Sequence, residues 1–478
     1  MPINSTHIEY DQNLHTWLRS RDVLAGEQTI RNAGTKYLPK LELQSQEEYA
    51  AYAARASFYN ATARTADAFL GTIFRRPPFL KIPANDLRAG PILVLENDAD
   101  LNGATLEAYA RFIVSEVLAV GRAGTLIDWE NTSEQRVYFT PCLAESILNW
   151  RTERIHGRPQ LSLLSLAETV QLPNPADPYV HQDIEQIRLL QLVPRPNHPG
   201  EFQCEVELWR RIPTPNRPES EWALFDRLVP LRKGQPLPAI PFVFHGPRHS
   251  RPSIDKPPLE DLIAVNLDHY RLNADYKHGM HFTALPTAWV SGFPADMELK
   301  IGSSTVWVSE RTDARAGFLE FTGQGLTTFE RAMDRDERLL ATLGSRLLEP
   351  QKRVAETAQA ISIRQSGELS VLGTMAISLS QSLTQALRWA WWWNSNEKHP
   401  DNISTEMLSF EINGDFDSSH MSSQDLLALV QAWQAGAITH GTLNEQLRRG
   451  EIVGVNRLEQ IQATATTAKT NTAIIPVP

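Results

Sequence analysis

One stretch of the chain, residues 257–395, constrains the fold more than any other. A long helical segment, a strand-rich insert and two further helical segments follow one another there. Apolar residues at helical spacing predict helices over 257–280, 325–349 and 356–393. Pro350 should end the second of them. The insert is rich in Trp, Val and Phe and is cut by Gly and Pro, which indicates short strands. Because no catalytic motif lies in this stretch, it is interpreted as a mechanical element.

Length and composition indicate a folded protein with several packed regions. The chain has 478 residues, of which 42% are hydrophobic and 21% are charged. No apolar run approaches the about 18 residues that a membrane helix needs, so no membrane partner is expected. The N-terminal residues resemble no export signal. Cys142 and Cys204 are the only cysteines, so we expect a reducing compartment and two buried thiols.

The net charge of −10 argues against a protein that grips nucleic acid over a broad basic face. An acidic wall would still suit a protein past which nucleic acid slides, and an acidic surface also simply favours solubility.

The rest of the chain alternates in character, and the predicted fold class is α+β. Residues 46–76 read as one helix, with Ser45 as N-cap and Glu48 at the capping-box position. Residues 136–245 carry short apolar runs at hairpin spacing and predict an antiparallel β region. The tail contains a predicted strand at 408–413 and two short helices before a Thr-rich end.

Few residues suggest chemistry. The chain has no phosphate-binding loop and no hydrolase or zinc motif. Asp128 and Glu130 flank a tryptophan at a strand end and could bind a divalent cation, although a solvated strand end is the commoner arrangement. His278 and His281 could share a metal, but no third ligand is evident. The enzyme alternative is therefore a soluble α+β metal-assisted enzyme that uses these four residues.

Four tryptophans stand in five positions, at Trp389, Trp391, Trp392 and Trp393. We expect that they cannot all face inward on one helix. A base-stacking platform is one interpretation. A role in the core and in a subunit interface fits the acidic composition better.

The order of segments matches a known family. The chain resembles bacteriophage portal proteins, and most closely a subset usually filed as a domain of unknown function. The segments that carry the resemblance are RDVLAGE (21–27), YLP (37–39), ASFYNATARTADAFLGTIFRRPP (56–78), VGRAGTLIDW (120–129), ESILNW (145–150), PPLEDLIAVNLDHYRLNADYKHGMHFTALPT (257–287), IGSSTVWV (301–308), FLEFTGQGL (318–326) and ETAQAISIRQSGELSVL (356–372). They occur in the expected order over about 350 residues, and none is a chemical signature.

The resemblance implies a portal-like layout. It consists of a wing (1–255), stem helix 1 (256–283), a clip (284–323), stem helix 2 (324–349), a channel loop (350–356), a long helix kinked near Gly367 and Gly373 (357–395), a crown (396–461) and a flexible tail (462–478).

The resemblance also implies a role. Portal subunits form a non-enzymatic ring, typically of 12 copies, that passes double-stranded DNA without sequence readout at one capsid vertex. Expected partners are a terminase, a head–tail adaptor, and capsid and scaffold proteins, in the virion and in the host cytoplasm during assembly. No cofactor and no metal are implied. Gln351, Lys352 and Arg353 would face the channel. The clip residues that would contact neighbouring subunits are Trp289, Val290, Trp307 and Val308.

Overall fold

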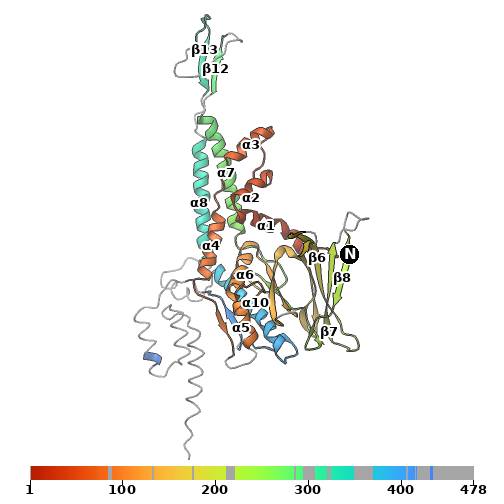
Figure 1. Cartoon of the computed structure of the whole chain (residues 1–478). Coiled ribbons are helices and arrows are strands. Elements are labelled where there is room, and N and C mark those ends of the chain that lie inside the picture. The colour runs from red at the N-terminus through yellow and green to blue at the C-terminus, as the bar shows by residue number, and fades with distance from the viewer. Residues whose placement is uncertain are drawn as a thin grey trace, which may run out of the picture. The chain divides into compact units, whose positions relative to one another are not determined.

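The protein is described from a computed structural model, and its fold is α+β, as predicted (Figure 1). The structure describes residues 2–83, 89–131, 134–174, 177–211, 221–284, 287–293, 307–319, 325–348, 370–404, 407–414, 416 and 431–433. Two compact units make up the chain. Unit 1 comprises Met1–Leu18, Ala66–Pro258 and Arg346–Pro478, and unit 2 comprises Arg19–Thr65 and Leu259–Ser345.

Unit 1 contains a three-stranded antiparallel sheet in the order β11-β2-β3. Its strands are β2 (Ala123–Trp129), β3 (Val137–Leu143) and β11 (Phe242–His245). The helices α5 (Ala89–Asn97), α6 (Leu106–Val120) and α10 (Val371–Asn394) belong to the same unit, and both α6 and α10 contact this sheet. Helix α6 is well delimited, because Thr105 caps its first turn and Gly121 ends it with φ 73°.

A five-stranded antiparallel sheet in unit 1 runs in chain order, β4-β5-β6-β7-β8. Its strands are β4 (Ile147–Ile155), β5 (Arg158–Asn174), β6 (Asp177–Pro194), β7 (Phe202–Arg211) and β8 (Trp222–Leu228). The antiparallel β region predicted for residues 136–245 is thereby confirmed. Two small pairings complete unit 1, β9 (Leu231–Arg232) with β10 (Gln235–Pro236), and β1 (Phe79–Lys81) with β14 (Ser409–Glu411). The strand predicted at 408–413 is β14.

The helix α10 is buried over most of its surface. It contacts β14, β11, β2, α5 and α6. All four clustered tryptophans are buried, with exposed fractions between 1% and 6%. The expectation that they cannot all face inward is therefore wrong, because the last part of α10, residues 389–393, is buried on all sides and so has more than one inward face. Their burial also removes the base-stacking interpretation.

The start of α10 differs from the predicted long helix over 357–395. Ser370 is extended and accepts a hydrogen bond from the backbone N–H of Gly373, so the helix begins at Val371. Gly373 thus lies in a first turn and not at a kink. Gly367 and the rest of 349–369 lie outside the described residues, as do most of the predicted crown and the whole tail 462–478.

Unit 2 is built around an antiparallel pair of long helices, α7 (Glu260–Ala284) and α8 (Leu326–Leu348) (Figure 1). The stem helices predicted for this region are therefore present as helices. Three shorter helices contribute to the unit, namely the end of α1 (Ile8–Ala25), α2 (Glu27–Asn32) and α3 (Gln46–Arg55). The strands β12 (Thr287–Ser291) and β13 (Arg315–Leu319) pair with each other beyond the ends of the helix pair.

The single helix predicted over 46–76 is wrong. The chain forms α3 and α4 (Ala61–Ile73), separated by an extended segment that begins at Ala56. In that segment the backbone N–H of Ser57 donates to Asn273, and Phe58 packs edge-on against Tyr270. Tertiary contacts with α7 therefore replace the helical hydrogen bonds of this segment. The predicted capping box at Ser45 is confirmed.

Candidate functional site

The helix pair of unit 2 is the first element of the candidate site. Its register follows from three contacts. Tyr276 donates a hydrogen bond to Glu330 over 2.7 Å, and the Nδ2 of Asn273 lies 4.0 Å from the sulfur of Met333. Farther along, the imidazole Nε2 of His269 lies 3.5 Å from a carboxylate oxygen of Glu337. The two helices therefore run antiparallel, side by side, over most of their length.

A buried polar cluster fixes α7 to the N-terminal part of unit 2. Asn266 is fully buried, and its carbonyl oxygen accepts hydrogen bonds from the backbone N–H and the hydroxyl of Thr62. Its amide donates to the carbonyl oxygen of Tyr59. Asn266 interrupts the apolar stripe of α7, and its burial with satisfied hydrogen bonds explains why.

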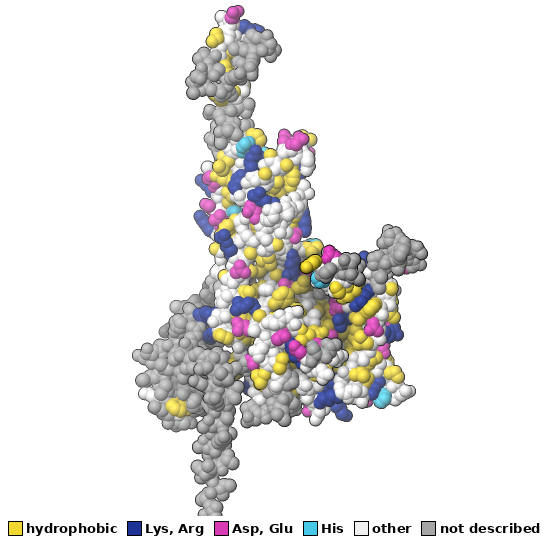
Figure 2. Space-filling view, viewed as in Figure 1, with side chains coloured by type: hydrophobic (Ala, Val, Ile, Leu, Met, Phe, Trp, Pro, Cys, Tyr) yellow, Lys and Arg dark blue, Asp and Glu magenta, His cyan; other side chains and the backbone are white. Residues whose placement is uncertain are grey.

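The helix α8 buries only a narrow face. Among its described side chains, Asp336, Leu340 and the Gly344 position are buried, and most others are exposed or half-buried. We call these three positions the inner stripe. Figure 2 shows basic and acidic side chains interspersed over the surface of the unit 2 helices. An isolated helix with so little buried surface is marginal, so α8 is suited to further packing against a partner.

The second element is the β12–β13 pair, which exposes apolar side chains. The indole of Trp289 lies across Gly317, where an added Cβ would approach its Nε1 to 3.0 Å. Trp289 is 44% exposed, Phe318 is 54% exposed and Val308 is 70% exposed. A lone two-stranded pair cannot bury these groups by itself.

The strand expected around Trp307 and Val308 is absent at these two residues, which have no regular structure. The partner of β12 is instead β13. Directly after β12, Gly292 has φ 80°, and its carbonyl oxygen accepts a hydrogen bond from the hydroxyl of Ser309. Trp289 and Val290 do lie in a strand, as predicted.

Gln351, Lys352 and Arg353 lie outside the described residues, so their place facing a channel stays a prediction.

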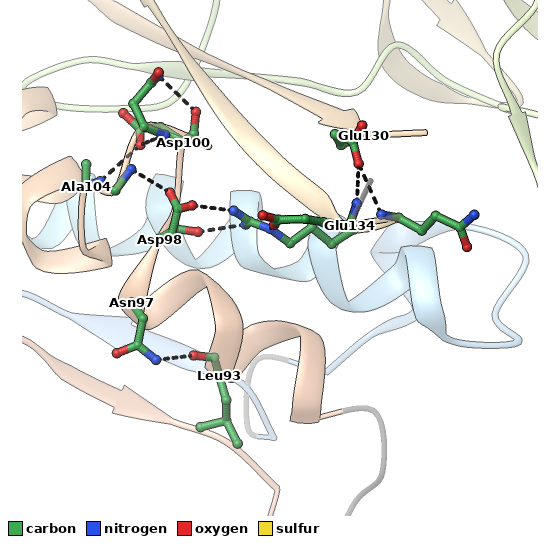
Figure 3. A network of polar contacts seen from close by, with 11 residues as sticks. Leu93, Asn97, Asp98, Asp100, Ala104, Glu130 and Glu134 are labelled. Carbon is green, nitrogen blue, oxygen red and sulfur yellow. Dashed lines mark hydrogen bonds and ion pairs between the residues drawn. The ribbon is translucent and has the colours of Figure 1, made fainter. Parts of the chain in front are cut away.

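Glu130 is held by its own loop. One of its carboxylate oxygens accepts the backbone N–H groups of Glu134 and Gln135, at 2.8 and 3.1 Å (Figure 3). In the same network, Arg136 binds the carboxylate of Asp98 at 2.6 Å and also pairs with Glu134. Glu130 therefore has a structural role in this loop.

Asp128 is also engaged within the protein. It lines a cavity of about 570 Å³ together with Trp129 and Trp393. One of its oxygens faces the guanidinium of Arg188 at 3.4 Å, and Arg188 pairs in addition with Glu168 at 2.7 Å. Its charge is therefore matched by an arginine.

The two histidines of the enzyme alternative contact aromatic and basic side chains. The ring of His278 packs edge-on against Tyr52 and Phe282. Burial, followed by the nearby charge of Arg55, lowers the pKa of His278. The Nε2 of His281 lies 3.0 Å from Arg55.

These contacts leave the metal-enzyme alternative without support. Asp128 and Glu130 belong to unit 1, and His278 and His281 to unit 2. In the described part of the chain, no group of three or more His, Cys, Asp or Glu residues could hold a metal ion.

Both cysteines are buried, as expected. Burial raises the pKa of the Cys142 and Cys204 thiols to about 12, so neither is a reactive thiolate. Across the described helices, none is both long and apolar enough to cross a membrane.

Two buried polar groups of unit 1 escaped sequence reasoning. His245 lies between the hydroxyls of Thr125 and Ser382, each 2.7 Å from one ring nitrogen. Arg122 is 2% exposed, stacks on Trp150 and donates to a backbone carbonyl. No local pattern marks either residue, because their partners come from distant parts of the chain.

Comparisons with known proteins place the central stretch in context. The family model described as "Domain of unknown function (DUF4055)" matches residues 258–394, which span the helix pair, the β12–β13 pair and α10. No curated protein matches the chain.

Solved structures from gene transfer agent (GTA) particles are similar at low identity. One is the virion of a native GTA particle, with 10% identity, coverage of 90% of this chain and 100% of that chain, and a TM-score of 0.37. The neck of a native GTA particle with C12 symmetry matches with 10% identity, coverage of 88% and 99%, and the same TM-score. The neck of an empty GTA particle with C6 symmetry matches with 11% identity, coverage of 82% and 90%, and the same TM-score. At these values the likeness does not by itself assign this chain a role.

Proposed function

We propose that the chain is the subunit of a viral portal, a non-enzymatic ring that forms the DNA channel at one capsid vertex. The ring would serve genome packaging, retention and ejection. It would dock a terminase and later a head–tail adaptor, and would contact capsid and scaffold proteins during assembly in the host cytoplasm. The resemblance implies 12 copies and passage of double-stranded DNA without base readout.

The observation that carries the proposal is the helix pair of unit 2 together with the strands inserted between its helices. The resemblance implies a stem of two helices joined by a clip, in this order and at these residues. Two long helices, α7 and α8, stand there in antiparallel contact, and β12 and β13 lie between them in sequence. The nine resembling segments, which extend from residue 21 to residue 372, support the same assignment.

The surface of the helix pair favours a ring over a monomer. The inner stripe of α8 is covered by its own chain, while the rest of the helix is largely exposed. Copies placed side by side would cover that surface. Closed rings arise when such heterologous contacts repeat through a rotation that closes.

The β12–β13 pair would form the clip, and its exposed side chains would contact a neighbouring subunit or the adaptor. Val308 is 70% exposed and Trp289 is 44% exposed. We expect Val308→Asp to leave the wing folded and to weaken ring assembly or adaptor binding, since the substitution would bury a charge in that contact. Intact rings that bind the adaptor as the parent does would count against this assignment.

The channel loop would be 350–356, with Gln351, Lys352 and Arg353 facing the DNA. Repeated around a ring, this basic pair would form a collar of positive charge at one height. Such a collar attracts phosphates without sequence preference and is screened by salt.

The test of the proposed function is the native mass of the purified full chain. A portal subunit should give a closed assembly of many 53.8 kDa subunits. A monomer or small oligomer at micromolar concentration across moderate salt would contradict the proposal. The alternative, a metal-assisted enzyme, predicts a monomer or small oligomer that shows metal-dependent turnover.

A further inference from the structure

Six charged side chains of α8 lie in two stripes outside the inner stripe. At about 100° per residue, one set of three arginines falls on the side opposite the inner stripe. This arginine stripe consists of Arg331, Arg335 and Arg338. The flank between the arginine stripe and the inner stripe carries Glu330, Asp334 and Glu337. Arg331 and Arg338 are exposed, and neither has an ion-pair partner among the residues that the structure describes.

The helix α7 carries three acidic side chains on one flank, where Asp268 is exposed and Asp275 is half-buried and accepts a hydrogen bond from Tyr52 over 2.6 Å. Asp261, Asp268 and Asp275 recur every seven residues, a spacing that returns to nearly the same side of a helix. Asp268 is 63% exposed and pairs over 2.7 Å with Arg271 of its own helix, which is 42% exposed. This pairing leaves the carboxylate open to a second cation.

The register of the helix pair places these opposite charges at the same heights. Tyr276 meets Glu330, and His269 meets Glu337. One residue away from each contact, Asp275 is therefore level with Arg331, and Asp268 is level with Arg338. Each residue rises by about 1.5 Å along an α-helix, so the two levels are about 10 Å apart on both helices.

A ring preserves these levels. Rotation about an axis that runs along the helices moves a subunit sideways and does not shift it in height. We propose that Arg331 and Arg338 of one subunit pair with Asp275 and Asp268 of the next. The contact holds neighbouring stems in electrostatic register. This inference rests on the proposed ring and names a second copy of the chain as the occupant of the arginine stripe.

Duplex DNA is the alternative partner that the arginine stripe could bind. The two stripes of α8 together hold three basic and three acidic side chains, so that surface has no excess of positive charge. The whole chain carries a net charge of −10. Both facts favour a partner that offers alternating charges over a uniform polyanion.

A charge exchange tests the pairing in the full chain. Arg338→Asp and Asp268→Arg should each raise the subunit concentration at which half the chains are in rings by at least about tenfold at low salt, because attraction becomes repulsion at every interface. The double exchange, Arg338→Asp with Asp268→Arg, should restore assembly toward the parent. Arg158→Asp is the control, since Arg158 is 70% exposed on β5 of unit 1, outside the helix pair and the β12–β13 pair, and gives the same change in net charge. Light scattering measures assembly, and circular dichroism verifies that each variant is folded.

Three outcomes would overturn the pairing. One is that both single variants assemble as the parent and the control do. Another is that the double exchange assembles no better than the weaker single variant. A third is that Arg338→Asp forms normal rings that retain DNA poorly, which would assign the arginine stripe to DNA. A parent chain that forms no rings at all would instead overturn the proposed function, and the pairing with it.

Discussion

Acidification should destabilise unit 1 through one buried histidine, His245. The ring is 1% exposed, and burial lowers its pKa from 6.5 to about 3. Its hydrogen bonds explain why the neutral form is held. Ser382 donates its hydroxyl proton to the carbonyl of Leu379, so its oxygen accepts the Nδ1–H of His245. The other ring nitrogen then accepts the hydroxyl proton of Thr125, whose oxygen accepts that of Tyr109.

The size of the effect follows from linkage between protonation and folding. The folded pKa of His245 lies below the unfolded pKa, so the unfolded chain takes up the proton first as the pH falls. The stabilisation is complete above pH 6.5 and is lost progressively toward pH 3. With pKa values of 6.5 and about 3, the free energy of unfolding should fall by about 2 kcal/mol between pH 8 and pH 5, and by about 3 kcal/mol between pH 8 and pH 4.

The assay compares the parent with His245→Gln by urea unfolding at pH 8 and pH 5. The fluorescence of the buried α10 tryptophans reports on unit 1. The amide of the variant can accept and donate a hydrogen bond without titrating, so all other groups contribute equally to both proteins. We expect the parent to lose about 2 kcal/mol more than the variant. Equal losses in the two proteins would refute the assignment of this pH dependence to His245.

Three further predictions concern a backbone strain, a helix cap and the channel. Gly121→Ala should cost about 1–3 kcal/mol in thermal unfolding, because φ is 73° and the new Cβ would lie 2.7 Å from a backbone carbonyl oxygen; Gly103→Ala, with φ 85° and open space, should cost less. Arg232→Ala should cost about 1–2 kcal/mol, because Arg232 donates to three carbonyl oxygens at and beyond the end of α10; an unchanged melting temperature would contradict this. Changing Lys352 and Arg353 to Ala should leave ring assembly intact and alter DNA packaging or retention, and unchanged packaging would remove the loop from the channel.

Sequence patterns predicted those helices, strands and caps that are determined by residues close together in the chain. Apolar spacing indicated α7 and α8, and alternating runs between turn residues indicated the antiparallel sheet. The capping box at Ser45 was predicted from two side chains three residues apart. In each case the determining residues are neighbours in the chain.

Predictions failed where tertiary contacts decide the structure. The residues 56–60 suit a helix, but their hydrogen bonds and aromatic contacts with α7 hold them extended. The tryptophans of α10 were expected to share a single buried face, whereas α10 packs against sheet, strand and helix on several of its sides. His245 could not be found from sequence, because its hydrogen-bond partners, Thr125 and Ser382, come from β2 and α10.

The candidate site shows the same division. The helix pair, the strand at Trp289 and Val290, and a strand overlapping β13 were predicted from pattern, but the segment at Trp307 and Val308, also expected as a strand, has no regular structure. The arginine stripe became meaningful only with the register between α7 and α8. A helical wheel gives the side on which a residue lies, and contacts between helices give its height.

Electron microscopy of the purified full chain would show whether it assembles into a ring. We expect closed rings with an open centre, in which α7 and α8 of every subunit line up around the axis and the loop 350–356 faces the opening. A field of single 53.8 kDa particles, or rings in which this loop lies on the outer wall, would contradict this expectation.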